Sequence, residues 1–463
     1  MKFSNDQEIA LEQMKSGQNT FLTGKAGTGK SSVLKAFIEW ALENDKNIIV
    51  SASTGAAAQN LADYNACTVH RAFGLKAKGI VSLPKKANKE ITAADIVVID
   101  EISMVRIDLF EHVATAVMLA DKEREHDEGI LARKEGREPD FKPVQLIVVG
   151  DFTQLPPVVT SLDKDALKAM FGTKVFAFES KLWKALDLHP AVLQVVHRQE
   201  GDEEFANALN AIRYCDKAND PFSETLDWFN LNTAKQPFTN DDSIILCGKN
   251  ATASEENEKR LRNIDADLYT SEAKIKGDAD ISSVNCEKVL NFKKGAKVMM
   301  LTNGNGYFNG STGIIDYVHE DEYDDEESYV CIRVNGERCY VYKNTYKVFK
   351  PVVDEKKKTV VGKDGQSKEI IEKTVKNEEA GEVIQYPFKL GYAVTIHKSQ
   401  GMTLTNGVNL KPEIWDSGQL YVALSRVDKR DNIYIDGILK ANNWKLDRKV
   451  IDFYKQIDSK WAN

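Results

Sequence analysis

The chain has 463 residues, of which 42% are hydrophobic and 29% are charged, which is typical of folded globular proteins and excludes a disordered chain. At roughly 150 residues per domain, this length favours about two to four domains. The formal net charge of −8 excludes a uniformly basic surface, although a basic groove can lie within an acidic molecule.

Cysteine usage and hydropathy argue against a secreted or membrane protein. The cysteines are scattered, without a C-x-x-C pair or a nearby histidine cluster, so we expect free thiols and neither a zinc site nor a disulfide framework. The first residues, MKFSNDQEIALEQMKSG, lack the apolar core of a signal peptide, and no apolar run is long enough to span a bilayer. We therefore expect a cytosolic protein that is not associated with a membrane. The six cysteines are Cys67, Cys215, Cys247, Cys286, Cys331 and Cys339.

Short apolar runs alternate with helical segments along most of the chain. The runs NTFLTG, NIIVSAS, DIVVIDE, QLIVVGD and SIILCG each end in Gly, Ser, Asp or Glu. Such runs are typical of parallel strands that are buried on both faces. Because ligand sites in open α/β sheets form at the carboxyl ends of the strands, these polar residues indicate one site.

The pattern changes at about Gly295. Alternating residues, Asn-Gly pairs and a high content of Val, Tyr and Ile predict antiparallel hairpins. One charged hairpin is expected beyond Val352, with its turn at residues 363–365. We interpret residues 314–385 as a small β-barrel inserted into a second α/β domain, because helical segments resume near Tyr386.

The segment GKAGTGKS, residues 24–31, fits G-x-x-x-x-G-K-[ST] between a strand and a helix, as in phosphate-binding loops. Backbone amides would hold the phosphates of ATP, Lys30 would reach the β and γ groups, and Ser31 would ligate Mg²⁺. A plain glycine-rich turn is the alternative. The predicted nucleotide contacts in the loop are Gly24, Ala26, Gly27, Thr28, Gly29, Lys30, Ser31 and Ser32.

Two later strand ends add chemistry to this loop. Asp100 and Glu101 end the strand of IVVIDEIS, where Asp100 can hold Mg²⁺ while Glu101 deprotonates the attacking water. Gln154 follows the strand of LIVVGDFTQLPPV and could sense the γ-phosphate. The alternatives are a helix cap for the acid pair and a loop stopped by prolines for Gln154.

Together with these elements, five further blocks carry a family resemblance. They are TVHRAFGL, LQVVHRQEGDEEFANALNAIR, FNGSTGII, YPFKLGYAVTIHKSQGMTL and GQLYVALSRV. The sequence resembles superfamily 1B DNA helicases, most closely the Pif (petite integration frequency) family, which is related to RecD and phage Dda helicases. The resemblance follows the family's order from about residue 5 to residue 435.

The resemblance implies an α/β fold with two RecA-like P-loop domains. Residues 1–190 would form the first domain, with a small wedge domain near 74–92, where lysines suit a DNA track. Residues 191–313 and 386–463 would form the second domain, and the inserted barrel of 314–385 would be SH3-like. The charged stretch of residues 121–141 is expected to be a solvated helical insert.

The resemblance also implies roles for residues outside the loop. Arg198 and Arg426 would act as arginine fingers on the transferring phosphoryl group, Gln7 would read adenine, and Gly401 would contact the nucleotide. Hydroxyl, imidazole and ammonium groups suit contacts to a phosphate backbone. The implied DNA contacts are Thr54, Gly55, Thr68, His70, Phe73, Pro156, Asn309, Thr395, His397 and Lys398.

The implied activity is ATP-dependent, 5′-to-3′ translocation on single-stranded DNA by a monomer that unwinds forked or tailed duplexes in replication, recombination or repair. Resemblance alone supports this polarity, and G-quadruplex DNA as a further substrate. A DNA-dependent ATPase that remodels protein–DNA complexes without strand separation is the main alternative. The intact set of catalytic residues argues against a DNA-binding module with a decayed ATPase. The TIHKSQG and GDFTQLPPV segments argue against an RNA helicase of another class.

Overall fold

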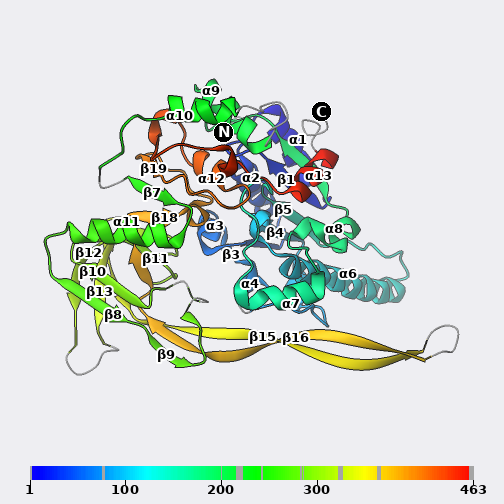
Figure 1. Cartoon of the computed structure of the whole chain (residues 1–463). Helices are drawn as coiled ribbons and strands as arrows, with labels where there is room; N and C mark the ends of the chain where they lie inside the picture. Colours follow the sequence, from blue (N-terminus) through cyan, green and yellow to red (C-terminus); the bar gives the residue numbers. More distant parts are fainter. Residues whose placement is uncertain are drawn as a thin grey trace.

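The computed structural model describes residues 3–75, 79–199, 201–214, 223–240, 243–281, 284, 286–321, 327–361 and 367–457. For residues 56, 59, 349–361 and 367–378 it describes the backbone alone. Two α/β domains and a domain of antiparallel strands lie side by side, and a long two-stranded arm extends from the strands (Figure 1). Within the described residues, no helix is both long and apolar enough to cross a bilayer.

The first domain is built on a six-stranded sheet in which every pairing is parallel. Its strands β1, β4 and β5 are buried along their whole length, as their apolar runs predict. Strand β6 pairs with β1 as far as Leu193, so the predicted boundary at residue 190 falls inside a strand. In sheet order the strands are β3 (Cys67–Thr68), β2 (Ile48–Ala52), β4 (Ile96–Asp100), β5 (Gln145–Val149), β1 (Thr20–Gly24) and β6 (His189–Leu193).

Helices cover this sheet, and two hydrophobic clusters fill the space between them. Helix α2 buries Val33, Leu34, Phe37, Ile38 and Ala41, a spacing that places them on one helical face. The helices are α1 (Asn5–Lys15), α2 (Lys30–Glu43), α3 (Gly55–Gln59), α4 (Val69–Ala72), α5 (Lys89–Ala93), α6 (Ile107–Glu135), α7 (Ser161–Phe171) and α8 (Lys181–Ala185).

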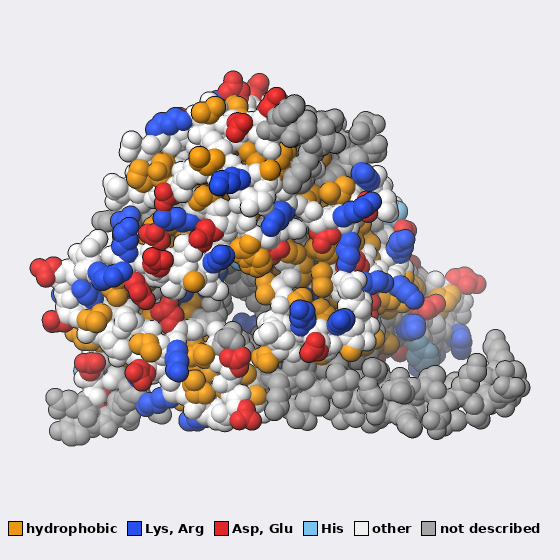
Figure 2. Space-filling view, viewed as in Figure 1, with side chains coloured by type: hydrophobic (Ala, Val, Ile, Leu, Met, Phe, Trp, Pro, Cys, Tyr) orange, Lys and Arg blue, Asp and Glu red, His pale blue; other side chains and the backbone are white. Residues whose placement is uncertain are grey.

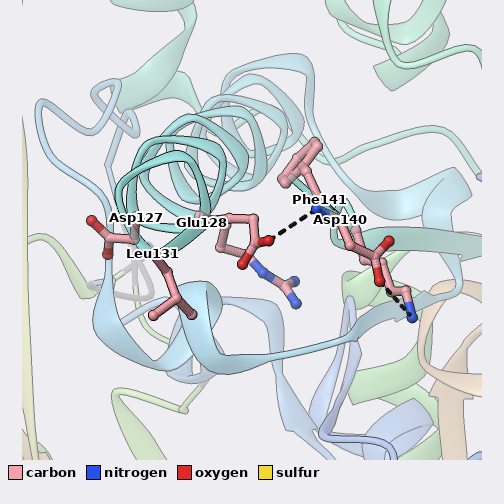
Figure 3. Close-up of a pocket in the computed structure, with 7 residues that line it drawn as sticks. Asp127, Glu128, Leu131, Asp140 and Phe141 are labelled. Carbon is pink, nitrogen blue, oxygen red and sulfur yellow. Dashed lines mark hydrogen bonds and ion pairs between the residues drawn. The ribbon is translucent and has the colours of Figure 1, made fainter. Parts of the chain in front are cut away.

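The charged insert of residues 121–141 continues helix α6 through Glu135, and the chain then returns as a loop. Figure 3 shows the cavity between the helix end and this loop, where Glu128 accepts a hydrogen bond from the Asp140 backbone N–H at 2.9 Å. Asp140 also pairs with Lys142 at 3.8 Å. The charged side chains of the insert therefore interact with one another at the surface. They do not belong to the polar residues at the carboxyl ends of the strands.

The predicted wedge segment, residues 74–92, has no strands among its described residues. Residues 79–88 form a loop that leads into α5, and residues 76–78 lie outside the described residues. Ile80 and Val81 are buried, and the Asp108 carboxylate accepts a hydrogen bond from the Val81 N–H at 2.8 Å. The loop is thus anchored to α6, and its role as a wedge stays a prediction.

The second domain has a four-stranded parallel sheet whose strands come from distant parts of the chain. In sheet order they are β18 (Ala393–Thr395), β7 (Ile244–Cys247), β19 (Val408–Leu410) and β20 (Ile433–Ile435). Its helices are α9 (Glu203–Tyr214), α10 (Glu224–Asn232), α11 (Asn250–Arg262) and α12 (Gln419–Leu424). A separate hydrophobic cluster joins these strands with α9, α10 and α12, so this domain has a core of its own.

The antiparallel domain begins before residue 314 and ends after residue 385, which corrects the predicted boundaries. Its five-stranded sheet runs β14-β13-β12-β11-β17, and the flanking strands β11 and β17 complete its core. The predicted boundaries cut this sheet because β11 and β17 are too short to show an alternating pattern. The strands are β8 (Leu268–Glu272), β9 (Lys274–Gly277), β10 (Val289–Lys293), β11 (Lys297–Met300), β12 (Thr312–His319), β13 (Tyr329–Val334), β14 (Glu337–Tyr342) and β17 (Phe388–Leu390).

The expected charged hairpin is longer than its sequence indicates. Strands β15 (Asn344–Val361) and β16 (Ser367–Gln385) pair along their whole length and pass beside α7 of the first domain (Figure 1). The turn predicted at residues 363–365 lies outside the described residues.

The C-terminal helix α13 (Arg448–Ile457) packs on the first domain, although we predicted residues 386–463 to belong to the second. The Phe453 ring stacks on Phe178, with ring centroids 4.4 Å apart, and also contacts Phe21. The hydroxyl of Tyr454, a fully buried side chain, lies 2.9 Å from Thr23 Oγ1. The sequence of α13 does not indicate which surface its apolar face packs on. Only the tertiary structure shows that this helix lies on the first domain.

A buried ion pair joins the two α/β domains behind the phosphate loop. Asp151 follows β5, and Arg213 lies near the end of α9, with Nε and Nη2 each 3.2 Å from the carboxylate. The Tyr454 hydroxyl lies 3.1 Å from Asp151 Oδ1. Burial by itself would raise the pKa of Asp151, but the charges of Arg213 and Lys30 hold it below its ordinary value.

We predict that Arg213→Met lowers the free energy of unfolding by about 3–5 kcal/mol, because it leaves the Asp151 carboxylate buried without its cation. A group with a depressed folded-state pKa stabilises the fold above its unfolded pKa, about 3.9 for Asp, so the loss is complete at pH 7. In the variant, burial without the cation raises the pKa of Asp151, so this carboxyl becomes protonated as pH falls toward 4 and the loss shrinks. Urea unfolding at both pH values measures the two losses.

The matched control is Arg333→Met, which breaks a half-exposed pair with Asp316 and should cost less than about 1 kcal/mol. An equally small loss for Arg213→Met would show that the buried pair does not hold the domains together.

Candidate nucleotide site and nucleic-acid groove

The phosphate loop lies between β1 and α2, with three glycines at positive φ. A Cβ on Gly27 would lie 2.6 Å from Arg198 Cβ, and one on Gly29 would lie 2.4 Å from Gln7 Nε2. Side chains at these positions would therefore push away two segments that the loop must approach. The backbone stays bare toward the space where phosphate oxygens would lie.

Lys30 begins α2, and its ammonium closes the loop by donating to the carbonyls of Gly24 and Lys25, each at 2.9 Å. Burial lowers its pKa, while the charges of Asp151 and Glu101 oppose that change. The lysine thus already neutralises part of the acidic strand ends, and a nucleotide's phosphates would replace carbonyls as its partners.

Asp100 and Glu101 lie at the end of β4, as predicted. Asp100 is 8% exposed, and its Oδ1 accepts a hydrogen bond from the Glu101 N–H at 2.9 Å. Burial and, second, the Glu101 charge raise the pKa of Asp100. Glu101 has φ 53° and ψ 48°, a left-handed conformation that is uncommon for glutamate and occurs most often at functional sites.

These carboxylates fit a divalent cation, because two crowded acids in a buried place need one for both to ionise. Asp100 and the Ser31 hydroxyl, at the start of α2, would hold Mg²⁺. Within the described ranges no group of three or more His, Cys, Asp or Glu side chains could hold a metal. The nucleotide and water would therefore supply its other ligands.

Arg198 and Arg426 approach this site from the second domain. The Arg198 Nη1 donates to the Ser425 carbonyl at 2.9 Å, and the Arg198 backbone N–H donates to the Gly27 carbonyl at 3.2 Å. Arg426 is 2% exposed, and burial lowers its pKa to about 10, with a further contribution from Arg198. Since the Glu101 charge acts on both guanidinium groups, the two arginines lie around the acid pair.

Gln7, Gln154 and Gly401 also surround the site. Gln7 Nε2 donates to the Thr28 carbonyl at 2.9 Å, so this amide supports the loop, and its reading of adenine stays a prediction. Gln154 is buried, and a Cβ on Gly418 of the second domain would lie 2.2 Å from its carbonyl oxygen. A Cβ on Gly401 would lie 3.9 Å from Glu101 Oε1, which places that turn against the acid pair.

Sequence reasoning missed Tyr421, whose hydroxyl accepts a hydrogen bond from the Ala26 N–H at 2.6 Å. This bond ties helix α12 to the phosphate loop across the domain boundary. Tyr421 lies within the quoted block GQLYVALSRV, but a tyrosine in an apolar helix has no pattern that distinguishes it from a core residue.

A groove runs from the first domain to the second through three connected cavities, two of which share Gly55 and two Lys398. Figure 2 shows a hollow where the antiparallel strands meet the first domain, while acidic and basic side chains are mixed over the rest of this face. The groove is lined by Asn65, Cys67, Thr68, Arg71, Asn303 and Phe308 at one end, by Thr54, Gly55, Glu101, Asn309, His397 and Gln400 in the middle, and by Lys398, Lys389, Lys288, Glu287 and Asn250 at the other end.

The structure brings six of the ten predicted DNA contacts to this groove: Thr54, Gly55, Thr68, Asn309, His397 and Lys398. Thr54 and Thr68 also cap the short helices α3 and α4. His70, Phe73, Pro156 and Thr395 do not line the described cavities. Phe73 is 6% exposed and packs edge-on against His112, which favours a core role for this ring.

Sequence reasoning missed two lysines at the groove, Lys389 and Lys288. Burial and, next, the charge of Lys389 lower the pKa of Lys398 to about 6, while Glu287 opposes the change. Two ammonium groups this close together would be stabilised by an anion between them. A sequence signal for Lys389 was present, because this lysine interrupts the apolar block YPFKLGY. Its closeness to Lys398 is revealed only by the tertiary structure, in which β17 meets the turn after β18.

Comparison with known proteins agrees with this geometry. A sequence family described as an AAA domain matches residues 7–160. The chain is 30% identical to the ATP-dependent DNA helicase Pif1 of Campylobacter jejuni, over 96% of each chain. It is also 30% identical to the Candida albicans helicase PIF1, but spans only 56% of that longer protein.

Among solved structures, the chain resembles Bacteroides Pif1 in complex with ADP-AlF3 and single-stranded DNA, with a TM-score of 0.74, 27% identity and coverage of 99% of this chain and 98% of that one. The TM-score with unliganded Bacteroides Pif1 is 0.58 at similar identity and coverage. Both the full-length match and the shared domain arrangement show that the chain belongs to the Pif1 family of ATP-dependent DNA helicases.

Proposed function

We propose that this protein uses ATP and Mg²⁺ to move along single-stranded DNA from 5′ to 3′ and to open forked or tailed duplexes. The observation that carries the proposal is that Glu101 belongs to two places at once. It lies beside Asp100 at the nucleotide site, and it also lines the middle of the groove. The site of ATP hydrolysis and the groove for the DNA strand thus share a residue.

The nucleotide would lie between the two α/β domains, where its hydrolysis supplies the free energy. Lys30 and the loop amides hold the phosphates from the first domain, and Arg198 and Arg426 reach them from the second. Glu101 takes a proton from the attacking water. Because Tyr421, Arg198 and Gln400 all bridge the two domains, a change at the phosphates would alter their relative position.

The groove suits a single strand. Its cationic, amide and hydroxyl groups match a phosphate backbone. The exposed Phe308 at one end could stack on a base. Polarity, a wedge near residues 74–92, action on G-quadruplex DNA, a monomeric state and roles in replication, recombination or repair belong to the proposal and rest on the family.

One experiment separates the parts of this proposal. ATP hydrolysis is measured with and without single-stranded DNA, and strand release is then measured from forks tailed at 5′ or at 3′. Stimulated hydrolysis with release only from the 5′-tailed fork supports the whole proposal. Stimulation without release leaves a translocase that remodels protein–DNA complexes, and the absence of stimulation overturns the substrate.

We predict that Lys30→Ala lowers kcat for ATP hydrolysis by at least about 10²-fold, because one preorganised positive charge is lost where negative charge develops. Binding of labelled single-stranded DNA should stay within about twofold of the unaltered protein, since the groove is not touched. Lys35→Ala, on the same helix but outside the loop, is the control and should hydrolyse normally. Full hydrolysis by the Lys30 variant would mean that the site is wrongly placed.

We predict that DNA affinity falls as pH rises from 6 to 9. Lys398 is mostly neutral above about pH 6, whereas a phosphate favours its charged form, so binding takes up a proton and costs up to about tenfold in affinity per pH unit. Lys389→Met removes the neighbouring charge, raises the pKa of Lys398 and should flatten this dependence near neutral pH. Fluorescence anisotropy across the pH range measures both proteins.

The matched control is Lys288→Met, which lies in the same cavity and should weaken binding without changing the pH slope. Glu287→Gln tests the other titratable group at this place and should also keep the slope. An affinity of the unaltered protein that does not change with pH would contradict the prediction.

A further inference from the structure

Gln400 connects the groove to the nucleotide site. It follows the turn η5 (Ile396–Ser399), which carries His397 and Lys398 into the groove. Its own side chain is 8% exposed and crosses to the first domain, where Nε2 lies 3.2 Å from Glu101 Oε2 and 3.3 Å from Ser103 Oγ. One buried amide therefore reaches the residue expected to deprotonate water.

The orientation of this amide follows from chemistry. A carboxylate only accepts hydrogen bonds, so the NH₂ group of Gln400 must face Glu101. The opposite orientation would place two acceptor oxygens together. The Oε1 atom of Gln400 is buried, and within the described part of the chain it has no hydrogen-bond partner. Because such a buried amide oxygen is costly, the contact of its NH₂ group accounts for the placement of the side chain.

The contact acts on a strained residue. Glu101 has a left-handed backbone, so its carboxylate direction depends on what holds the side chain. The next residue, Gly401, has φ 80°, which favours glycine, and a Cβ there would lie at ordinary contact distance from the first domain, 3.6 Å from Asn60 Nδ2 and 3.9 Å from Glu101 Oε1. The bond to Gln400 can therefore form only when the second domain lies against the first.

The arrangement of domains in which this contact exists resembles that of a relative on nucleic acid. The TM-score is 0.74 with the single-stranded DNA complex of Bacteroides Pif1 and 0.58 with its unliganded form. The contact is thus present in an arrangement closer to the one in which that relative holds a strand.

We propose that Gln400 is a positioning residue that makes the orientation of Glu101 conditional on a strand in the groove. Phosphates bound at His397 and Lys398 hold the turn against the first domain, and Gln400 then fixes the Glu101 carboxylate toward the attacking water. Without a strand the turn withdraws, and Glu101 loses this partner. The inference rests on the proposed function, because it explains how DNA would stimulate hydrolysis.

The test uses Gln400→Met, which keeps the length of the side chain but has no donor. ATP hydrolysis is measured at saturating ATP against increasing concentrations of oligothymidylate. We expect the rate at saturating oligothymidylate to fall about tenfold, as the loss of one hydrogen bond to a charged group implies. The rate without DNA should fall less than the stimulated rate, and the KM for ATP should stay within about twofold.

Three matched variants separate positioning from other effects. His397→Ala removes a groove contact, so it should raise the half-saturating concentration of oligothymidylate and keep the maximal rate. Ser103→Ala removes the other partner of Gln400 and should keep most of the stimulation. Gln400→Glu can donate a hydrogen bond only when protonated, so its stimulated rate should recover as pH falls from 8 to 6, which the Met variant should not do.

The outcomes are distinguishable. An unaltered protein that DNA does not stimulate overturns the proposed function itself. With normal stimulation of the unaltered protein, three results for Gln400→Met overturn the positioning role: an unchanged maximal rate, an equal fall of the rates with and without DNA, or a change only in the half-saturating concentration. Thermal unfolding checks that the variant is folded, and Gln400→Glu with its pH profile decides the question if it is not.

Discussion

The structure depends on one buried ion pair, Asp151 with Arg213, because it joins the two α/β domains directly behind the phosphate loop. Asp151 follows β5 in the first domain, and Arg213 comes from α9 in the second. Tyr454 of the C-terminal helix completes the pair, so three distant segments meet at one carboxylate. Breaking such a pair leaves a charge without solvent or partner, which makes this joint strong.

At the nearby nucleotide site, by contrast, charges of the same sign lie close together. Asp100 and Glu101 crowd two negative charges into a buried strand end, and Lys30, Arg198 and Arg426 lie around them. Burial raises the pKa of Asp100 and lowers the pKa of Lys30, Arg198 and Arg426. The arrangement becomes balanced when phosphates and a divalent cation join it, which is a physical reason for ligand binding to draw the domains together.

The groove illustrates how an acidic protein can hold a polyanion. Whole-chain charge is −8, and acidic and basic side chains mix over the surface, but lysines meet at one end of the groove. Burial and the nearby charge of Lys389 lower the pKa of Lys398, and a phosphate bound there would favour the charged form of Lys398. Gln400, two residues beyond Lys398, donates a hydrogen bond to Glu101 and so connects this end of the groove to the nucleotide site.

The sequence by itself determined the local chemistry: the phosphate loop, the acid pair, the buried parallel strands and the family. These depend on glycines, apolar runs and strand ends, which are features of neighbouring residues. Only the tertiary structure decided that α13 packs on the first domain, that β11 and β17 complete the antiparallel sheet, and that Phe73 lies in the core. The same holds for the contacts of Arg213, Lys389 and Gln400. Each of them joins segments far apart in the chain, and no local pattern encodes the partner of a single buried side chain.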